Sequence, residues 1–311
     1  MLELYAAIWR VSGRRQVILI LLSMAIAALA AVPLSYQKDI INELTDDQIS
    51  QSLLIELCAE MMGIIVLSLG LKWALGFLAN TLGEDVIRRL RRRIYGVAVG
   101  GGTEISAGTA TTMVSAEAEE LGKFAGSAYS EPVVQLGTMV SVVGYIATAQ
   151  PFLGLIALCI VAPQVVLVLS TQRVVNRLVA ERVQVLRQAT RDMVENDLAA
   201  EVSAVTTAFD TIYDTRRQMF LWKLSTKFVL SLINGAGTVG VLFLGGWYVL
   251  KGQTDVGTVV AATMGLARLQ GPTSFLIAFY RQISATRVKF ELLRDVAIPK
   301  PDRETATSLR A

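Results

Sequence analysis

Two long polar stretches interrupt a chain that is otherwise strongly apolar. The first covers about residues 83–131 and the second about residues 171–227, and both contain several arginines. Stretches this charged cannot lie in lipid, because a charged side chain at the bilayer centre costs about 2.5–3.5 kcal/mol on insertion scales. The second stretch also carries apolar side chains at helical spacing. The sequence therefore predicts membrane hairpins joined by two long helical arms on one side of the membrane.

The composition agrees with a membrane protein. Of 311 residues, 53% are hydrophobic and 18% are charged, which is too apolar for an ordinary soluble protein. Histidine is absent, which removes the commonest proton shuttle and metal ligand. Cys58 and Cys159 lie in apolar runs with no metal-binding spacing. We therefore expect an all-α polytopic membrane protein without metal chemistry, and nothing indicates a nucleic-acid partner.

Six apolar runs approach the length of about 20 residues that a helix needs to cross a bilayer. The predicted spans are residues 17–34, 53–82, 133–149, 152–169, 228–250 and 257–280. The first has no clear small-residue cleavage site, which favours a retained span over a cleaved signal peptide. Residues 1–16 are predicted to form a cytoplasmic elbow helix, and residues 296–311 a short flexible cytoplasmic tail.

The arginines indicate the orientation of these spans. Arg10, Arg14, Arg15, the cluster at 88–93 and the arginines of the second arm all fall on one side. The outer loops hold only Lys38 and Lys251. Because basic residues are enriched on the cytoplasmic side, both arms and both termini are predicted to be cytoplasmic, in a multi-pass protein of the inner membrane.

The most specific motifs surround the sixth span. They are GQTDVG at 252–257, where Asp255 or Thr254 can cap the helix, LQGP at 269–272 and RVKFELL at 287–293. Together with Pro33 and Pro163, they resemble the transmembrane domain of type I ABC exporters, which have the type IV fold. The resemblance covers nearly all of the chain. It implies that residues 17–295 form a six-span domain that assembles as a domain-swapped dimer with a second copy or a homologous membrane subunit.

The resemblance also points to the segments that contact the ATPase. In the first arm, GTATTMVSAE at 108–117 is similar to the family's first coupling helix, with Met113 where the family usually has Arg and Glu117 where it usually has Asp. In the second arm, residues 197–209 keep an acidic residue and a Phe but lack the usual Gly and Lys. The implied coupling candidates are Thr111, Thr112, Met113, Val205, Thr206 and Phe209.

A phosphate-binding Walker loop requires Gly-x-x-x-x-Gly-Lys followed by Ser or Thr, and no such sequence occurs in the 311 residues. We therefore expect that this chain is not an enzyme on its own and holds no cofactor. ATP and Mg would be bound by separate ABC ATPase subunits.

Arg268 is the candidate for contact with a transported molecule. It follows Gly257 by 11 positions, which corresponds to about 17 Å along a helix and places it near mid-depth. Contact with substrate and a structural ion pair both remain open. The weaker candidates for a substrate cavity are Glu131, Gln135, Gln164 and Asn234, since such residues more often hydrogen-bond between helices. Two copies of the arginine in a homodimer would favour an anionic amphiphile as cargo, either lipid-linked or peptide-like.

Two other functions stay open at this point. An ATPase-free, ion-coupled transporter of the same fold would require a protonatable carboxylate at mid-depth, whereas Glu56 and Glu60 lie near the outer end of their span. A non-transporting membrane scaffold or receptor would have no need of polar residues on inward helix faces.

Overall fold

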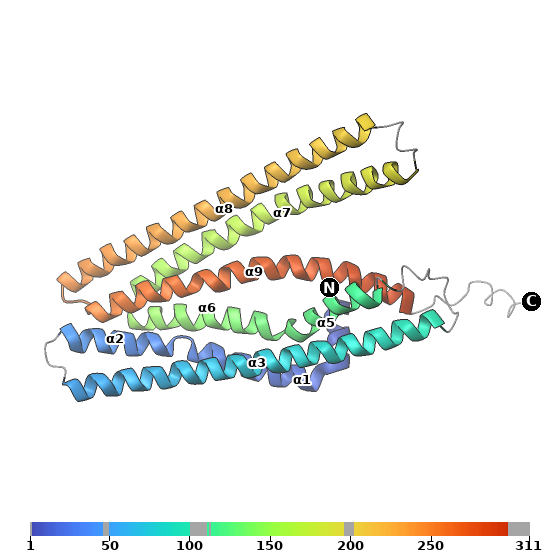
Figure 1. Ribbon diagram of the computed structural model, residues 1–311. Coiled ribbons are helices and arrows are strands. Elements are labelled where there is room, and N and C mark those ends of the chain that lie inside the picture. The colour runs from blue at the N-terminus through green and yellow to red at the C-terminus, as the bar shows by residue number, and fades with distance from the viewer. Residues whose placement is uncertain (1, 46–49, 100–110, 112, 196–201, 298–311) are drawn as a thin grey trace, which may run out of the picture. The chain divides into compact units, whose positions relative to one another are not determined.

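The computed structural model describes residues 2–45, 50–99, 111, 113–195 and 202–297. Over these residues the elements are all helical, and no strand is found in them. In order they are α1 (Leu2–Leu29), α2 (Val32–Thr45), α3 (Gln51–Val99), the π-helical turn η1 (Met113–Glu117), α5 (Ala118–Ser127), α6 (Ser130–Ala149), α7 (Pro151–Glu195), α8 (Val202–Leu250) and α9 (Val256–Ala297) (Figure 1). The all-α prediction is confirmed.

The length of the helices is the main feature of the fold. The helices α3 and α8 have 49 residues each and α7 has 45. At 1.5 Å per residue, each is about 70 Å long, more than twice the thickness of a hydrocarbon core of about 30 Å. The second, fourth and fifth predicted spans therefore continue as the same helices, α3, α7 and α8, into the adjoining arms, and a large part of each of these helices must lie outside the lipid.

Five helical stretches are long and apolar enough to cross a membrane. They are Leu2–Thr45, Gln51–Val97, Met113–Ala149, Pro151–Leu186 and Thr206–Leu250, and they contain the first five predicted spans. The sixth predicted span, residues 257–280, lies within α9, which is helical over its whole length but is not among these five. A count of six spans stays a prediction.

The first predicted span is divided between two helices. Helix α1 ends at Leu29 and α2 begins at Val32, with Pro33 in the first turn of α2. Proline is tolerated there because the first N–H groups of a helix have no partner within the helix. Toward the N-terminus, α1 continues without a break into residues 2–16, so the predicted elbow segment and the start of the first span form one helix.

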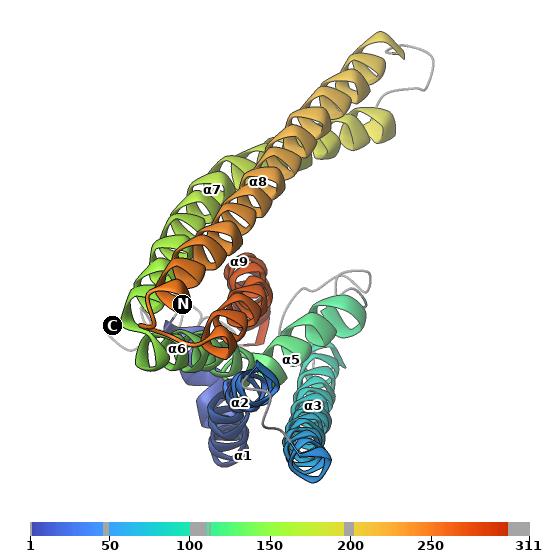
Figure 2. The same cartoon turned by 90° about the vertical axis from the view of Figure 1, so that its left-hand side faces the viewer.

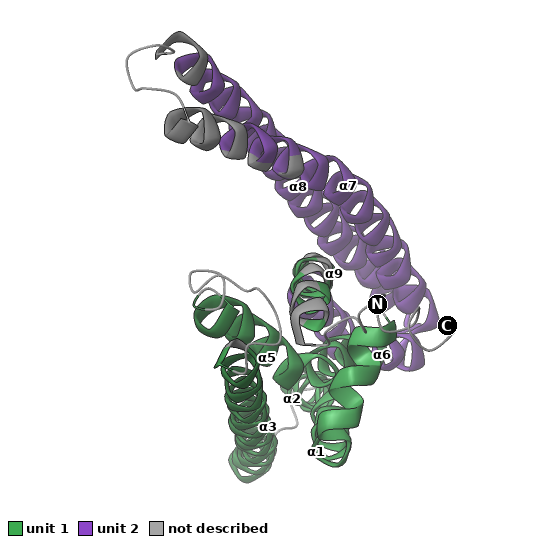
Figure 3. Cartoon of the chain, turned by 90° about the vertical axis from the view of Figure 1, so that its right-hand side faces the viewer, with its two compact units in different colours: residues 1–142, 274–311 green, residues 143–273 purple. Residues whose placement is uncertain are grey.

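The chain divides into two compact units (Figure 3), residues 1–142 with 274–311 and residues 143–273. The first unit has an aromatic core around Phe124, whose ring stacks on Phe279 at 5.9 Å between centroids and meets the edge of Tyr5 at 6.1 Å. Tyr129 donates a hydrogen bond from its hydroxyl to the carbonyl oxygen of Tyr5 at 2.9 Å. These contacts fix α1, α5 and the C-terminal half of α9 around one core.

Helices α3 and α5 approach each other closely through small residues. A Cβ added to Gly122 would lie 2.2 Å from Cγ1 of Ile87 and 2.9 Å from the carbonyl oxygen of Gly83. A Cβ added to Gly126 would lie 2.3 Å from the carbonyl oxygen of Ala79. This is the small-x-x-x-small packing of membrane helices, in which the absence of side chains allows two backbones to meet.

The second unit is built on α7 and α8, which lie side by side in the views of Figures 1 and 2. Gly237 of α8 leaves space for Ile160 of α7, because a Cβ at that position would lie 2.3 Å from Cδ1 of the isoleucine. Between α8 and α9, Gly252 adopts a φ of 69°, a left-handed conformation that favours glycine. Asp255 then caps α9 by accepting a 2.6 Å hydrogen bond from the N–H of Thr258, which confirms one of the two predicted caps.

The glycine contact gives a stability prediction. Gly126→Ala places a methyl group against the backbone oxygen of Ala79, which cannot move without shifting α3. Overpacking of this kind costs about 1–3 kcal/mol, so the unfolding midpoint of the purified chain in detergent should fall. Gly76→Ala is the matched control, since a Cβ there meets nothing within 4 Å. Equal midpoints for the two variants would contradict the close α3–α5 contact.

Candidate functional site

Two of the predicted cavity residues meet within the second unit. Gln164 of α7 donates from Nε2 to Oδ1 of Asn234 of α8 at 2.7 Å, and the glutamine is only 3% exposed. Pro163 lies inside α7 immediately before it. A buried amide without a partner would be costly, and this bond gives each of the two side chains one partner. The pair makes the helix–helix hydrogen bond that the sequence left open as the alternative to a ligand contact.

A second polar contact lies on the same seam between α7 and α8. Thr226 donates from Oγ1 to Oγ1 of Thr171 at 3.1 Å. Thr171 follows Gln164 by about two helical turns, or roughly 10 Å. Two hydrogen bonds at this spacing favour one register of α7 against α8, because a slide by one turn would separate both pairs and leave the buried Gln164 amide without Asn234.

The other cavity candidates lie on different elements. Glu131 and Gln135 are one turn apart on the same face of α6, and both are half-buried in the first unit. Arg268 is exposed on α9 within the second unit. Of the five candidates, the structure thus joins Gln164 to Asn234 and places Glu131 beside Gln135. A single cavity that all five share stays a prediction.

The coupling candidates of the second arm lie at the beginning of α8. Thr206 and Phe209 are exposed, and Phe209 shows 49% of its surface. Tyr213, one turn further along, is exposed as well, so two aromatic side chains lie along one face of the helix. Val205 belongs to the same helix. This end of α8 presents an apolar face that could bind a partner protein.

The candidates of the first arm have a different position. Thr111 is exposed, Thr112 falls outside the described residues, and Met113 is only 6% exposed. Met113 belongs to the aromatic core of the first unit, where it clusters with Leu4 and Ile94. Its side chain packs in this core and is not available to touch an ATPase. Met113 could therefore contribute to coupling only by fixing the position of η1.

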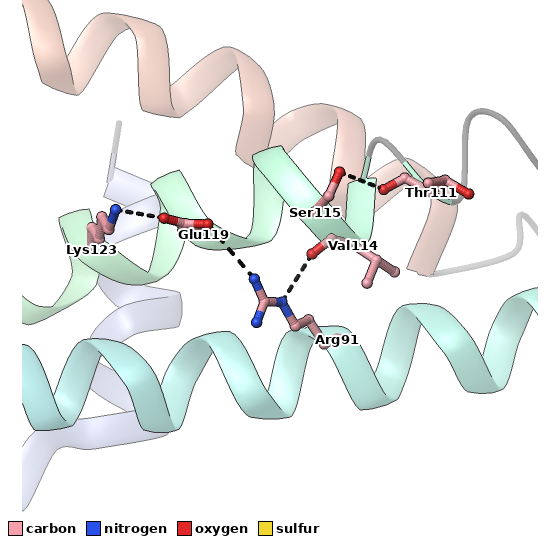
Figure 4. A network of polar contacts seen from close by, with 6 residues as sticks. All are labelled: Arg91, Thr111, Val114, Ser115, Glu119 and Lys123. Atoms are coloured by element: carbon pink, nitrogen blue, oxygen red, sulfur yellow. Dashed lines mark hydrogen bonds and ion pairs between the residues drawn. The ribbon is translucent and has the colours of Figure 1, made fainter.

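An arginine of the basic cluster fixes the segment around η1 (Figure 4). Arg91 of α3 donates from Nε to the carbonyl oxygen of Val114 at 3.0 Å, and its Nη2 lies 3.7 Å from Oε2 of Glu119. Lys123 donates from Nζ to Oε1 of the same glutamate at 2.5 Å. A π-helical turn is rare and often occurs at a functional position. Arg91 therefore connects the predicted coupling segment directly to the long helix α3.

The charges in this network reinforce one another. The hydrogen bond from Lys123 lowers the pKa of the Glu119 carboxyl, and the positive charge of Arg91 acts in the same direction. The same hydrogen bond raises the pKa of Lys123. Both groups are thus held in their charged forms at neutral pH, and the arm segment keeps its two ion pairs.

The model of one protein family, the ABC transporter transmembrane region, matches residues 17–273. The chain belongs to this family. The match begins where the first predicted span begins and includes both arms and all the candidate residues named above. No curated protein sequence matches the chain. The chain therefore contains an ABC transporter transmembrane region and is a multi-pass integral membrane protein.

Two contacts of this ABC transmembrane region were not predicted from the sequence. The spacing Gly122-x-x-x-Gly126 was available as a signal, but it lies in the polar arm, where close packing of membrane helices was not expected. The hydrogen bond from Arg91 to Val114 had no signal in the sequence, because the acceptor is a backbone oxygen, which every residue type carries.

A double-mutant cycle on Gln164 and Asn234 tests the polar seam. Gln164→Leu and Asn234→Leu should each lower the unfolding midpoint, because each leaves the other amide unsatisfied. The double variant should lose less unfolding free energy than the two single variants lose together. The difference should be about 0.6 kcal/mol and at most about 1.7 kcal/mol.

The control cycle pairs Gln164→Leu with Thr226→Val, which are not bonded to each other and should be additive. Additive losses for Gln164 and Asn234 as well would contradict a bond between the two amides.

Proposed function

We propose that this chain is the membrane-spanning subunit of an ATP-driven ABC exporter. Membership of the ABC transmembrane family supports a membrane-spanning transporter subunit, and the 311 residues contain no Walker loop that could bind ATP. In this proposal, separate ATPase subunits bind ATP and Mg, while two membrane subunits, identical or homologous, enclose the pathway. The membrane subunits would lie in the inner membrane with both termini in the cytoplasm.

The observation that carries the proposal is the exposed apolar face at the beginning of α8. Phe209 and Tyr213 lie at one end of a continuous helix whose other end contains the fifth predicted span. A continuous helix transmits a displacement at one end to the other. Binding of ATP between the two ATPase subunits would draw the arms together and open the pathway outward, and hydrolysis would reset it.

The proposed cargo is an anionic amphiphile, such as a lipid-linked or peptide-like molecule. Gln164 and Asn234 bind each other, so their amides serve the α7–α8 seam in the described state. Arg268 remains the candidate for the anionic group, since a guanidinium binds a carboxylate or phosphate through two parallel hydrogen bonds.

Phe209→Asp tests the coupling surface. A carboxylate in the apolar contact with an ATPase would be buried without a partner, at a cost of several kcal/mol. Thr211→Asp is the matched control, because Thr211 is also exposed but lies on the opposite face of the same turn. We expect the Phe209 variant to lose co-purification with the ATPase, and with it ATP-dependent transport, while the Thr211 variant keeps both.

The partner in this experiment is identified by its Walker sequence in mass spectrometry and by its ATPase activity. Normal transport by the Phe209 variant would show that Phe209 is not in the coupling surface. Failure to recover any ATPase with the unaltered chain in mild detergent would contradict the separate-subunit proposal.

A further inference from the structure

A cavity rich in arginine opens between α1 and α3, within the first unit. Its volume is about 470 Å³, and its polar wall is formed by Arg10, Arg14, Arg15, Asp85 and Arg89, with Trp9 at one side. Four guanidinium groups and one carboxylate thus line the cavity. None of its lining residues is a coupling candidate or belongs to the polar seam between α7 and α8.

Two of these arginines are engaged by the protein itself. Arg15 forms an ion pair with Asp85, and Arg89 donates from Nη1 to the carbonyl oxygen of Val11 at 3.4 Å. The hydrogen bond from Arg15 lowers the pKa of Asp85, so this carboxyl is charged at neutral pH. Arg10 and Arg14 form no ion pair with any residue that the structure describes. The cavity therefore keeps a positive charge that no carboxylate of the described residues neutralises through an ion pair.

The position of the cavity along the two helices indicates its depth in the membrane. Arg14 and Arg15 come just before the first predicted span begins at Val17, and Leu82, which also lines the cavity, ends the second. With the orientation proposed above, the cavity lies at the cytoplasmic surface of the bilayer, at the level of the lipid headgroups. Trp9 fits this depth, because tryptophan is enriched at membrane interfaces.

The walls of the cavity are suited to an amphiphile. Leu82 and Val86 of α3 and the indole of Trp9 provide apolar surface next to the guanidinium groups. A free phosphate ion would use only the charged side. A phospholipid would use both, and the leaflet presents it to the cavity at high local concentration. Basic pockets between membrane helices on the cytoplasmic side are a known way to bind anionic headgroups.

We propose that this cavity binds the phosphate group of an anionic phospholipid of the cytoplasmic leaflet, with Arg10 and Arg14 as the principal ligands. The bound lipid would neutralise the two arginines and connect α1 to the part of α3 that leaves the membrane. The site is additional to the proposed transport pathway, although its depth rests on the orientation proposed for the exporter.

Trp9 provides a direct reporter for the test. The chain has four tryptophans, and replacement of Trp73, Trp222 and Trp247 by Phe leaves Trp9 as the only indole. The full chain is reconstituted in phosphatidylcholine vesicles that contain brominated phosphatidylglycerol or brominated phosphatidylcholine at equal mole fraction. Bromine near the headgroup end of the acyl chains quenches an indole that it approaches, so the ratio of the two quenching constants measures preference for the anionic lipid.

We expect brominated phosphatidylglycerol to quench Trp9 more strongly than brominated phosphatidylcholine, with a preference that falls as salt is raised. Arg10→Gln with Arg14→Gln should reduce the preference by about 25-fold, since each arginine near an anionic surface contributes about fivefold in affinity. Arg10→Lys with Arg14→Lys keeps the charge and should retain most of the preference. Circular dichroism and gel filtration establish that each variant is folded.

Arg92→Gln with Arg93→Gln is the matched control, because both arginines belong to the same basic cluster on α3 but do not line the cavity. This variant should keep the preference. Equal quenching by the two lipids in the unaltered chain, or an equal loss in the control, would overturn the proposal. Quenching that inorganic phosphate abolishes at constant ionic strength would also overturn it, by showing that the cavity takes the free ion.

Discussion

The mismatch between helix length and membrane thickness determines how this protein is built. A backbone that crosses lipid must satisfy its N–H and C=O groups internally, so the spans are helical. Helices of about 70 Å exceed a hydrocarbon core of about 30 Å, and their remaining length carries the charged residues of the arms. In α3, α7 and α8, span and arm are thus one element, and a force on the arm reaches the membrane through a continuous helix.

Long helices need specific contacts to keep their register, because apolar side chains gain little from packing against each other instead of against lipid. The structure supplies two kinds of contact. In the first unit, Gly122 and Gly126 bring α5 against the backbone of α3. In the second, the pairs Gln164–Asn234 and Thr171–Thr226 connect α7 to α8.

The sequence predicted the helical class, long apolar helices at the first five predicted spans and the cap at Asp255, because these depend on local composition and spacing. It did not predict the break between Leu29 and Val32 or the burial of Met113. The first depends on a proline one residue past a helix start, and the second on core packing between α1, α3 and η1, which are distant in the sequence. The hydrogen-bond partners of Arg91 and Gln164 likewise depend on which helices lie side by side, which local composition does not determine.

The central claim is that both arms leave the membrane on the cytoplasmic side. Single cysteines at Ser50, Ala116, Thr207 and Leu242, with Cys58 and Cys159 replaced by alanine, test it by reaction with an impermeant maleimide. All four positions are exposed in the chain. The account predicts reaction at Ser50 in intact cells, reaction at Ala116 and Thr207 only after the cells are opened, and none at Leu242 within the lipid. Reaction at Ala116 or Thr207 from outside intact cells would contradict it.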